Sequence, residues 1–150
     1  MDIHELIRLE EIVPVLRAQT KRQALLELAR KAAPAAGIAQ AEIAAALLRR
    51  EREGATGVGE GVAIPHGRFQ QLSRICGLFA RLVRPIEFGA PDGQPVDLLF
   101  LLLTPQNAGG EHLKSLAQIA RLFREPDIAA RLRAAAGRAE LYAVLTSVAA

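Results

Sequence analysis

Long apolar runs are missing from this 150-residue sequence. No stretch reaches the length of about 20 apolar residues that a membrane-spanning helix needs, and the N-terminus MDIHELIRLEEI lacks the basic-then-apolar order of a secretory signal. Linkers, internal repeats and low-complexity tracts are missing too. We therefore expect a single domain over residues 1–150 that stays in the cytoplasm and does not insert into a membrane.

Cysteine is also scarce, and charged residues of one sign are not concentrated in any segment. The only cysteine, Cys76, lies within the apolar run ICGLFARLV, so it forms no internal disulfide and we expect it in a core strand. The 19 basic and 16 acidic side chains are spread along the chain, and the arginines at 49–53 alternate with glutamates. Because nucleic-acid binding needs a concentrated basic face, we expect no nucleic-acid partner.

The signatures of several catalytic and metal sites are absent. The sequence has no HExxH, no CxxC and no GxSxG nucleophile elbow. A zinc site built on His66 and His112 is one alternative, but no third ligand stands at a recognisable spacing. We therefore expect no metal and no cofactor, and we disfavour an acyl hydrolase.

Apolar spacing predicts several helices. The first begins after Thr20, which forms a capping box with Gln23, and is ended by Pro34 and Gly37. A second covers residues 41–53. A third starts near Glu111, and two shorter helical segments follow Pro126. The apolar stripe expected on the third helix consists of Leu113, Leu116, Ala117, Ala120 and Phe123.

Two apolar segments predict strands, Ile75–Val83 and Val96–Thr104. The second, VDLLFLLLT, is apolar without interruption, as in a central strand that is covered on both faces. The sequence GVAI before Pro65 predicts a shorter strand, and APDGQP predicts a turn. Helices before, between and after strands indicate an α/β layered domain.

The segment GATGVGEGVAIPHG is the most unusual part of the chain, because it holds five glycines and one of the three histidines. We place His66 where a short strand passes into a loop, a common position for functional side chains. A neutral imidazole is a good nucleophile at cellular pH and can attack phosphorus. Four features could supply donors to a phosphoryl group: the glycine-rich backbone, the Thr56 hydroxyl, the Arg50 guanidinium, and His112 in the first turn of a helix. His4 lies in a polar N-terminal segment and is expected at the surface.

The run Arg50-Glu51, Gly54 and TGVGEGVAIPHGR resembles the signature of type 2 IIA domains of the bacterial phosphotransferase system, the fructose/mannitol and nitrogen-regulatory branch. The likeness continues through PIEFGAPDGQPVDLLFLLLTP and EHLKSLAQIARLF, and is closest to the nitrogen-regulatory IIA type. It implies a single layered α/β domain whose mixed sheet of about five strands is flanked by helices on both faces.

The resemblance also implies a role for each matching residue. His66 corresponds to the phosphoryl acceptor, which reacts through Nε2, His112 to a phosphate-stabilising partner, and Arg50 to the residue that neutralises charge. The expected phosphate-binding loop residues are Thr56, Gly57, Gly59, Gly61 and Gly67. Ala55 stands where the family usually has a serine, so one hydroxyl donor is missing.

The implied activity is phosphotransfer without a cofactor, with an HPr-like protein as phosphoryl donor. FGAPDGQPVDLLF resembles the nitrogen branch more closely, and the chain ends at Ala150 without a IIB, membrane or HPr-like domain, so we favour a regulator whose phosphorylation controls binding to target proteins. The alternatives are a sugar-specific IIA subunit that passes phosphate to a IIB domain, and a non-catalytic protein-binding module. For the regulator, we expect phosphorylation to place charge on an otherwise apolar docking surface around His66.

Overall fold

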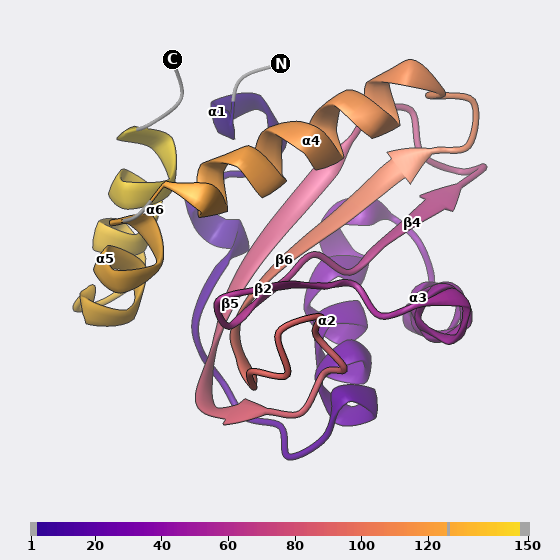
Figure 1. The fold of residues 1–150 in the computed structure, drawn as a ribbon. Coiled ribbons are helices and arrows are strands. Elements are labelled where there is room, and N and C mark those ends of the chain that lie inside the picture. Colours follow the sequence, from indigo (N-terminus) through magenta and orange to yellow (C-terminus); the bar gives the residue numbers. More distant parts are fainter. Residues whose placement is uncertain (1–2, 126, 148–150) are drawn as a thin grey trace.

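A computed structural model describes residues 3–125 and 127–147, and its centre is a mixed sheet of six strands. The elements in chain order are α1 (Ile3–Leu6), the 3-10 turn η1 (Leu9–Glu11), β1 (Ile12–Leu16), α2 (Lys21–Ala36), α3 (Gln40–Glu53), β2 (Gly57–Gly59), β3 (Val62–Ala63), β4 (His66–Phe69), β5 (Cys76–Ile86), β6 (Val96–Pro105), α4 (Gly110–Arg124), α5 (Ile128–Ala134) and α6 (Arg138–Ser147). The strand order is β1-β5-β6-β3-β2, and β4 also pairs with β6 (Figure 1).

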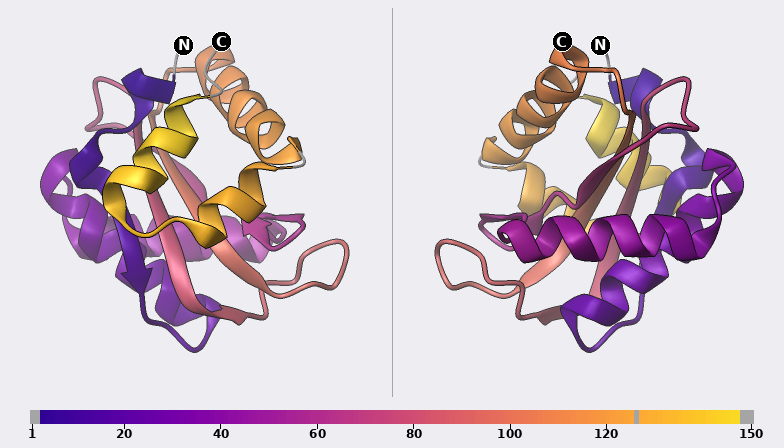
Figure 2. Two further views of the ribbon diagram at one scale, coloured as in Figure 1. Left: turned by 90° about the vertical axis from the view of Figure 1, so that its left-hand side faces the viewer. Right: turned by 90° about the vertical axis from the view of Figure 1, so that its right-hand side faces the viewer.

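Strand β6 is buried on both faces, as its apolar sequence predicts. Leu99, Leu101 and Leu103 belong to a core cluster with α2 and α3, whereas Leu98, Phe100 and Leu102 belong to a second cluster with α1, α4, α5 and α6. The change of cluster at every residue is the period of two expected for a strand. Helices therefore cover both faces, and Figure 2 shows the two layers from opposite sides. The predicted α/β fold with a mixed sheet is confirmed.

Three of the six strands were not predicted. Strand β1 contains Pro14, which has no amide proton for a ladder, and it lies at an edge of the sheet where that loss is tolerated. Strands β2 and β4 are only three and four residues long. Their pairing with β3 and β6 defines them, because so few residues carry no readable alternation.

Helix α2 begins as predicted but ends later. The Thr20 hydroxyl accepts a hydrogen bond from the Gln23 amide at 3.1 Å, while the Gln23 side chain accepts from the Gln19 amide rather than from Thr20. The prediction that Pro34 ends the helix was wrong, because Pro34 lies inside it. The helix stops at Gly37, whose φ of 69° is left-handed, after the Gly37 amide has bonded to the Ala33 carbonyl.

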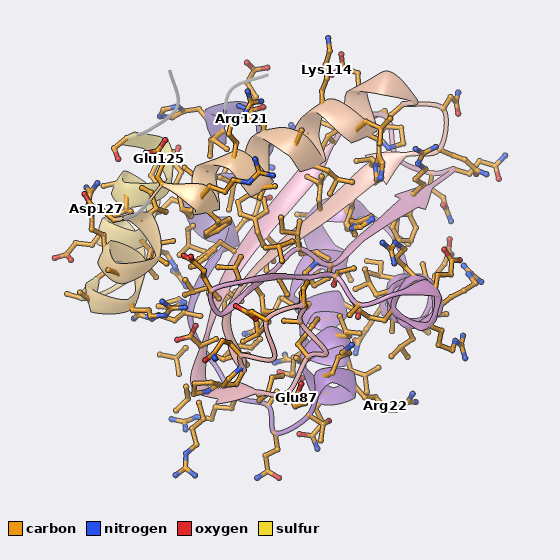
Figure 3. The ribbon with its side chains drawn as sticks, viewed as in Figure 1. Arg22, Glu87, Lys114, Arg121, Glu125 and Asp127 are labelled. Carbon is orange, nitrogen blue, oxygen red and sulfur yellow. The ribbon has the colours of Figure 1, made fainter. Side chains whose placement is uncertain are left out.

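The buried face of α4 also differs from the prediction. It consists of His112, Ser115, Ile119, Leu122 and Phe123. Leu113 from the predicted stripe is 65% exposed, and Lys114 projects away from the sheet (Figure 3). Hydropathy assigns His112 and Ser115 to solvent, but the helix turns both polar residues inward, so that a histidine reaches the end of β6.

Cys76 begins β5 and packs partly buried against the core cluster that contains α2 and α3. Burial raises the pKa of its thiol, which keeps the group protonated. The position agrees with the expected place in a strand, although the side chain is not fully enclosed.

We expect Phe100→Ala to lower the free energy of unfolding by about 3–5 kcal/mol, the usual cost of a large cavity in a packed core. The Phe100 side chain is fully buried, and its ring lies 6.4 Å from the Phe123 ring in an edge-on arrangement. Urea denaturation measures the loss. Val83→Ala is the matched control, because Val83 in β5 is 50% exposed and its truncation should change stability little. Equal losses in the two variants would contradict the description of this core.

Candidate phosphoryl-transfer site

His66 is the first residue of β4, where it pairs with Leu102 of β6. It therefore begins a strand and does not leave one, which corrects the expected position. Its half-buried ring has Nδ1 2.9 Å from the Ile64 carbonyl oxygen. A carbonyl oxygen only accepts hydrogen bonds, so Nδ1 carries the proton and the lone pair is on Nε2. The backbone thus places the lone pair of the ring on Nε2.

Arg50 faces that lone pair. Its Nε donates to Nε2 of His66 at 3.1 Å, and its Nη1 donates to the Gly54 carbonyl at 2.8 Å. The second bond closes the end of α3 and fixes the guanidinium beside β4. A positive group with further donors therefore lies where a substituent on Nε2 would be.

His112 lies across from His66, with the two ring centroids 5.4 Å apart. It belongs to the first turn of α4 and is only 5% exposed. Its Nδ1 lies 2.6 Å from the Thr104 hydroxyl oxygen at the end of β6. Sheet pairing and the α4 orientation thus bring together two histidines that are 46 residues apart in the sequence.

Both rings are held in the neutral form. Burial lowers the pKa of His66, and nearby positive charge, chiefly from Arg50, lowers it further against the opposing effect of the Ile64 hydrogen bond. Burial, together with nearby positive charge of which Arg68 is the largest source, lowers the pKa of His112 to about 4. A neutral His66 keeps its lone pair available at cellular pH.

The two rings line an open cleft of about 350 Å³. Its lining consists of Ala46, Arg49, Arg50, Glu53, His66, Gly67, Arg68 and His112. Three arginines against one glutamate make this cleft suitable for an anion. The expectation of an apolar surface around His66 is therefore wrong for the cleft, whose lining is mainly polar.

Of the predicted loop residues, Gly67 lines the cleft and Thr56 does not. Thr56 is 5% exposed, and both its amide and its hydroxyl are hydrogen-bonded to the Glu51 carboxylate. Lys21 Nζ also bonds to Glu51, at 2.8 Å. The Thr56 hydroxyl therefore holds the loop onto α3 in this structure, and the phosphate contact of Thr56 stays a prediction.

Gly57, Gly59 and Gly61 build the β2–β3 hairpin and do not line the cleft around His66, so their role in phosphate binding also stays a prediction. Positive φ angles of 58° at Glu60 and 78° at Gly61 form its tight turn. The Gly61 carbonyl accepts from the Asp97 and Leu98 amides at the start of β6. His66 pairs with Leu102, which lies four residues beyond Leu98 and therefore about 13 Å further along β6. A glycine-rich hairpin and a phosphate loop have the same composition, so the sequence alone did not show the hairpin.

Sequence reasoning missed four residues of this region: Arg49, Glu51 and Arg68 were given no role, and Thr104 was only the end of a strand. The sequence contained a signal for Arg68, because residues 66 and 68 lie on the same side if their segment is a strand. We instead predicted a loop after His66. Glu51 was visible as the neighbour of Arg50. Nothing in the sequence linked Thr104 to His112.

The described residues contain no group of three or more His, Cys, Asp or Glu side chains arranged to hold a metal ion. Among the helices within 3–125 and 127–147, none is long and apolar enough to cross a membrane.

Comparison with known proteins places this geometry in a family. The model of the phosphoenolpyruvate-dependent sugar phosphotransferase system, EIIA 2, matches residues 5–148. The chain belongs to this family. The resemblance carried by the IPHG run and the HLKSLAQIARLF helix is thereby confirmed.

The relatives of this EIIA domain come from two functional groups. A nitrogen regulatory protein of Bradyrhizobium diazoefficiens is 54% identical over 145 residues, covering 97% of this chain and 95% of the relative. The crystal structure of nitrogen regulatory protein IIA-Ntr from Neisseria meningitidis has a TM-score of 0.91 at 38% identity, covering 96% of this chain and 99% of that one. A fructose-specific EIIA component of Haloferax volcanii is 38% identical over 103 residues, covering 68% of this chain and 66% of the relative.

In this EIIA domain we expect His112 to titrate with a midpoint near pH 4, well below the ordinary value of 6.5. Because the folded state then binds fewer protons than the unfolded state between these values, the free energy of unfolding should decrease as the pH falls from about 6.5 to about 4. NMR titration of the His112 ring protons measures the midpoint. Urea denaturation of His112→Gln should show a weaker pH dependence than wild type, and an NMR midpoint near 6.5 would contradict the prediction.

Proposed function

We propose that this EIIA domain is a cytoplasmic phosphocarrier that accepts a phosphoryl group on Nε2 of His66 and acts mainly as a phosphorylation-dependent regulator. The observation that carries the proposal is the pair of contacts on His66, with Nδ1 held by the Ile64 carbonyl and Nε2 facing Arg50. These contacts leave the lone pair on one defined nitrogen, in a cleft whose charge suits an anion.

The proposed donor is a phosphohistidine on an HPr-like protein. Nε2 of His66 attacks phosphorus in line, a new N–P bond forms, and the donor's N–P bond breaks with its electron pair returning to the donor imidazole. No proton has to leave His66, because its proton stays on Nδ1 against the Ile64 carbonyl. The hydrogen bond from Arg50 Nε to Nε2 of His66 must break as attack begins. The guanidinium is then free to bond with the phosphoryl oxygens.

Charge stabilisation follows from the cleft lining. A phosphoryl group brings nearly two negative charges, which Arg49, Arg50 and Arg68 offset at close range. His112 adds a nearby ring nitrogen as a donor. The reaction uses no metal in this proposal, because guanidinium and imidazole donors supply the charge and hydrogen bonds.

A regulatory output is supported by the nitrogen regulatory proteins, which are similar to this chain over nearly its whole length. The proposed switch is the neutralisation of positive charge at the cleft. The unmodified cleft carries an excess of arginine, and phosphorylation offsets that excess. A target protein that binds beside His66 would therefore bind the two forms with different affinities.

We expect wild-type protein incubated with phosphoenolpyruvate, enzyme I and an HPr-type donor to gain about 80 Da in an acid-labile form, and His66→Ala to gain nothing. Intact-mass spectrometry measures the gain. His4→Ala is the control, because it removes a histidine from α1, outside the cleft. Labelling of His66→Ala equal to wild type would refute the acceptor assignment.

Three further variants test the groups around the acceptor. Arg50→Ala should slow phosphoryl acceptance about a hundredfold, since it removes a donor aimed at the developing charge, and Arg50→Lys should recover only part of the rate. His112→Ala should still accept the group but should pass it on more slowly. The rates come from mass spectra taken at timed intervals. A wild-type rate and phosphoform lifetime in Arg50→Ala would exclude Arg50 as a phosphate partner.

The second candidate is a sugar-specific EIIA subunit that passes phosphate to a IIB domain, which the fructose-specific relative favours. Rapid loss of the label to a purified IIB domain would support this alternative. Stable phosphoprotein in the presence of IIB domains, with different affinities of the two forms for a regulatory target, would support regulation. Absence of any label would leave a non-catalytic protein-binding module.

A further inference from the structure

A buried hydroxyl and a buried imidazole meet where β6 ends and α4 begins. Thr104 is fully buried and His112 is 5% exposed, and the hydroxyl oxygen lies 2.6 Å from Nδ1. Helix α4 leaves Leu113 65% exposed while turning His112 inward. Buried polar groups are costly unless they are hydrogen-bonded, so this contact stabilises the inward position of the ring.

The hydroxyl has one proton and two neighbouring acceptors. The first is Nδ1 of His112 at 2.6 Å, and the second is the Gly67 carbonyl oxygen at 3.5 Å. A hydroxyl normally donates over about 2.5–3.0 Å, so its proton points to Nδ1. A neutral imidazole that accepts at Nδ1 carries its own proton on Nε2.

The two site histidines are therefore held in opposite tautomers. The Ile64 carbonyl keeps the proton of His66 on Nδ1, so its Nε2 has a lone pair. The Thr104 hydroxyl does the reverse at His112, so its Nε2 has a hydrogen. Both rings line the cleft, with centroids 5.4 Å apart. One ring thus offers a nucleophile and the other a hydrogen-bond donor.

We propose that Thr104 is a positioning residue that holds His112 in the Nε2–H tautomer, so that this ring donates a hydrogen bond to the phosphoryl group on His66. The inference rests on the proposed function. It explains why a hydroxyl stands beside His112 and a carbonyl beside His66, since a carbonyl at Nδ1 of His112 would move the proton away from the cleft.

The same hydroxyl also serves a protonated His112. If the arriving negative charge draws a proton onto the ring, Nδ1–H donates to the Thr104 oxygen, and the hydroxyl proton turns to the Gly67 carbonyl. Threonine can exchange these roles because a hydroxyl both donates and accepts. Valine has nearly the same shape and can do neither.

Nitrogen-15 NMR of the unphosphorylated protein tests the tautomer directly. In wild type and Thr104→Ser, Nδ1 of His112 should resonate as an unprotonated nitrogen and Nε2 as a protonated one. In Thr104→Val the two shifts should move toward each other, because the preference is lost. A protonated Nδ1 in wild type, or unchanged shifts in Thr104→Val, would overturn the proposal. The wild-type spectrum decides the tautomer even if Thr104→Val fails to fold, and Thr104→Ala then replaces that variant.

Phosphorylation kinetics test the consequence. Thr104→Val should accept the phosphoryl group about tenfold more slowly than wild type, as expected for one lost hydrogen bond to a charged group, and Thr104→Ser should recover the rate. Thr146→Val, which removes a hydroxyl from α6, should be unaffected. A wild-type rate in Thr104→Val would overturn the proposal even if the tautomer changed. Failure of wild type itself to become labelled would instead refute the proposed function, whereas the NMR result is independent of labelling.

Discussion

Strand β6 is the constraint on which the rest of the structure depends. It pairs with β5 on one side and with β3 and β4 on the other, and its side chains alternate between two helical layers. Its pairing with β4 places His66 beside Leu102, and its last residues carry Thr104 to the start of α4. The site is therefore the place where the ladder between β4 and β6 meets the first turn of α4. A shift of that ladder by one residue would turn His66 to the other face of the sheet.

The electrostatics of the site combine two neutral imidazoles with several guanidinium groups. Burial and the arginines act in the same direction on the histidines, because both disfavour a second positive charge. Among the described residues that line the cleft, Glu53 supplies the one carboxylate, so the positive charge of the arginines is only partly compensated in the unmodified protein. The cleft therefore presents positive charge to an anion, while Nε2 of His66 remains unprotonated.

Arg50 and Glu51 are neighbours in the sequence but make contacts with different parts of the structure. Arg50 turns toward His66, while the Glu51 carboxylate, whose side chain is 6% exposed, bonds to Lys21 and to Thr56. Lys21 also lies 4.8 Å from the centroid of the Phe88 ring. Glu51 thus ties the loop after α3 to the start of α2, and the loop in turn leads into the β2–β3 hairpin. The threonine and glycines of this segment shape the backbone that leads to His66, and Gly67 alone of the predicted loop residues lines the cleft.

The sequence by itself determined helices α2 to α6, the two long strands, the family, and His66, Arg50 and His112 as candidate site residues, but it did not predict the short helix α1. These features depend on long apolar periodicities and on a compact motif, both of which are local. Only the tertiary structure decided that β1, β2 and β4 are strands, that α4 turns His112 inward, and that Gly57, Gly59 and Gly61 form a hairpin. Each of these depends on contacts between different segments: short strands exist only through their partners, and the buried ring of His112 is stabilised by its hydrogen bond with Thr104. The tautomer of His112 belongs to the same class, because the Thr104 hydroxyl beside its Nδ1 comes from β6 and not from α4. The tautomer of His66 is more local, because the carbonyl at its Nδ1 belongs to Ile64, two residues earlier in the chain.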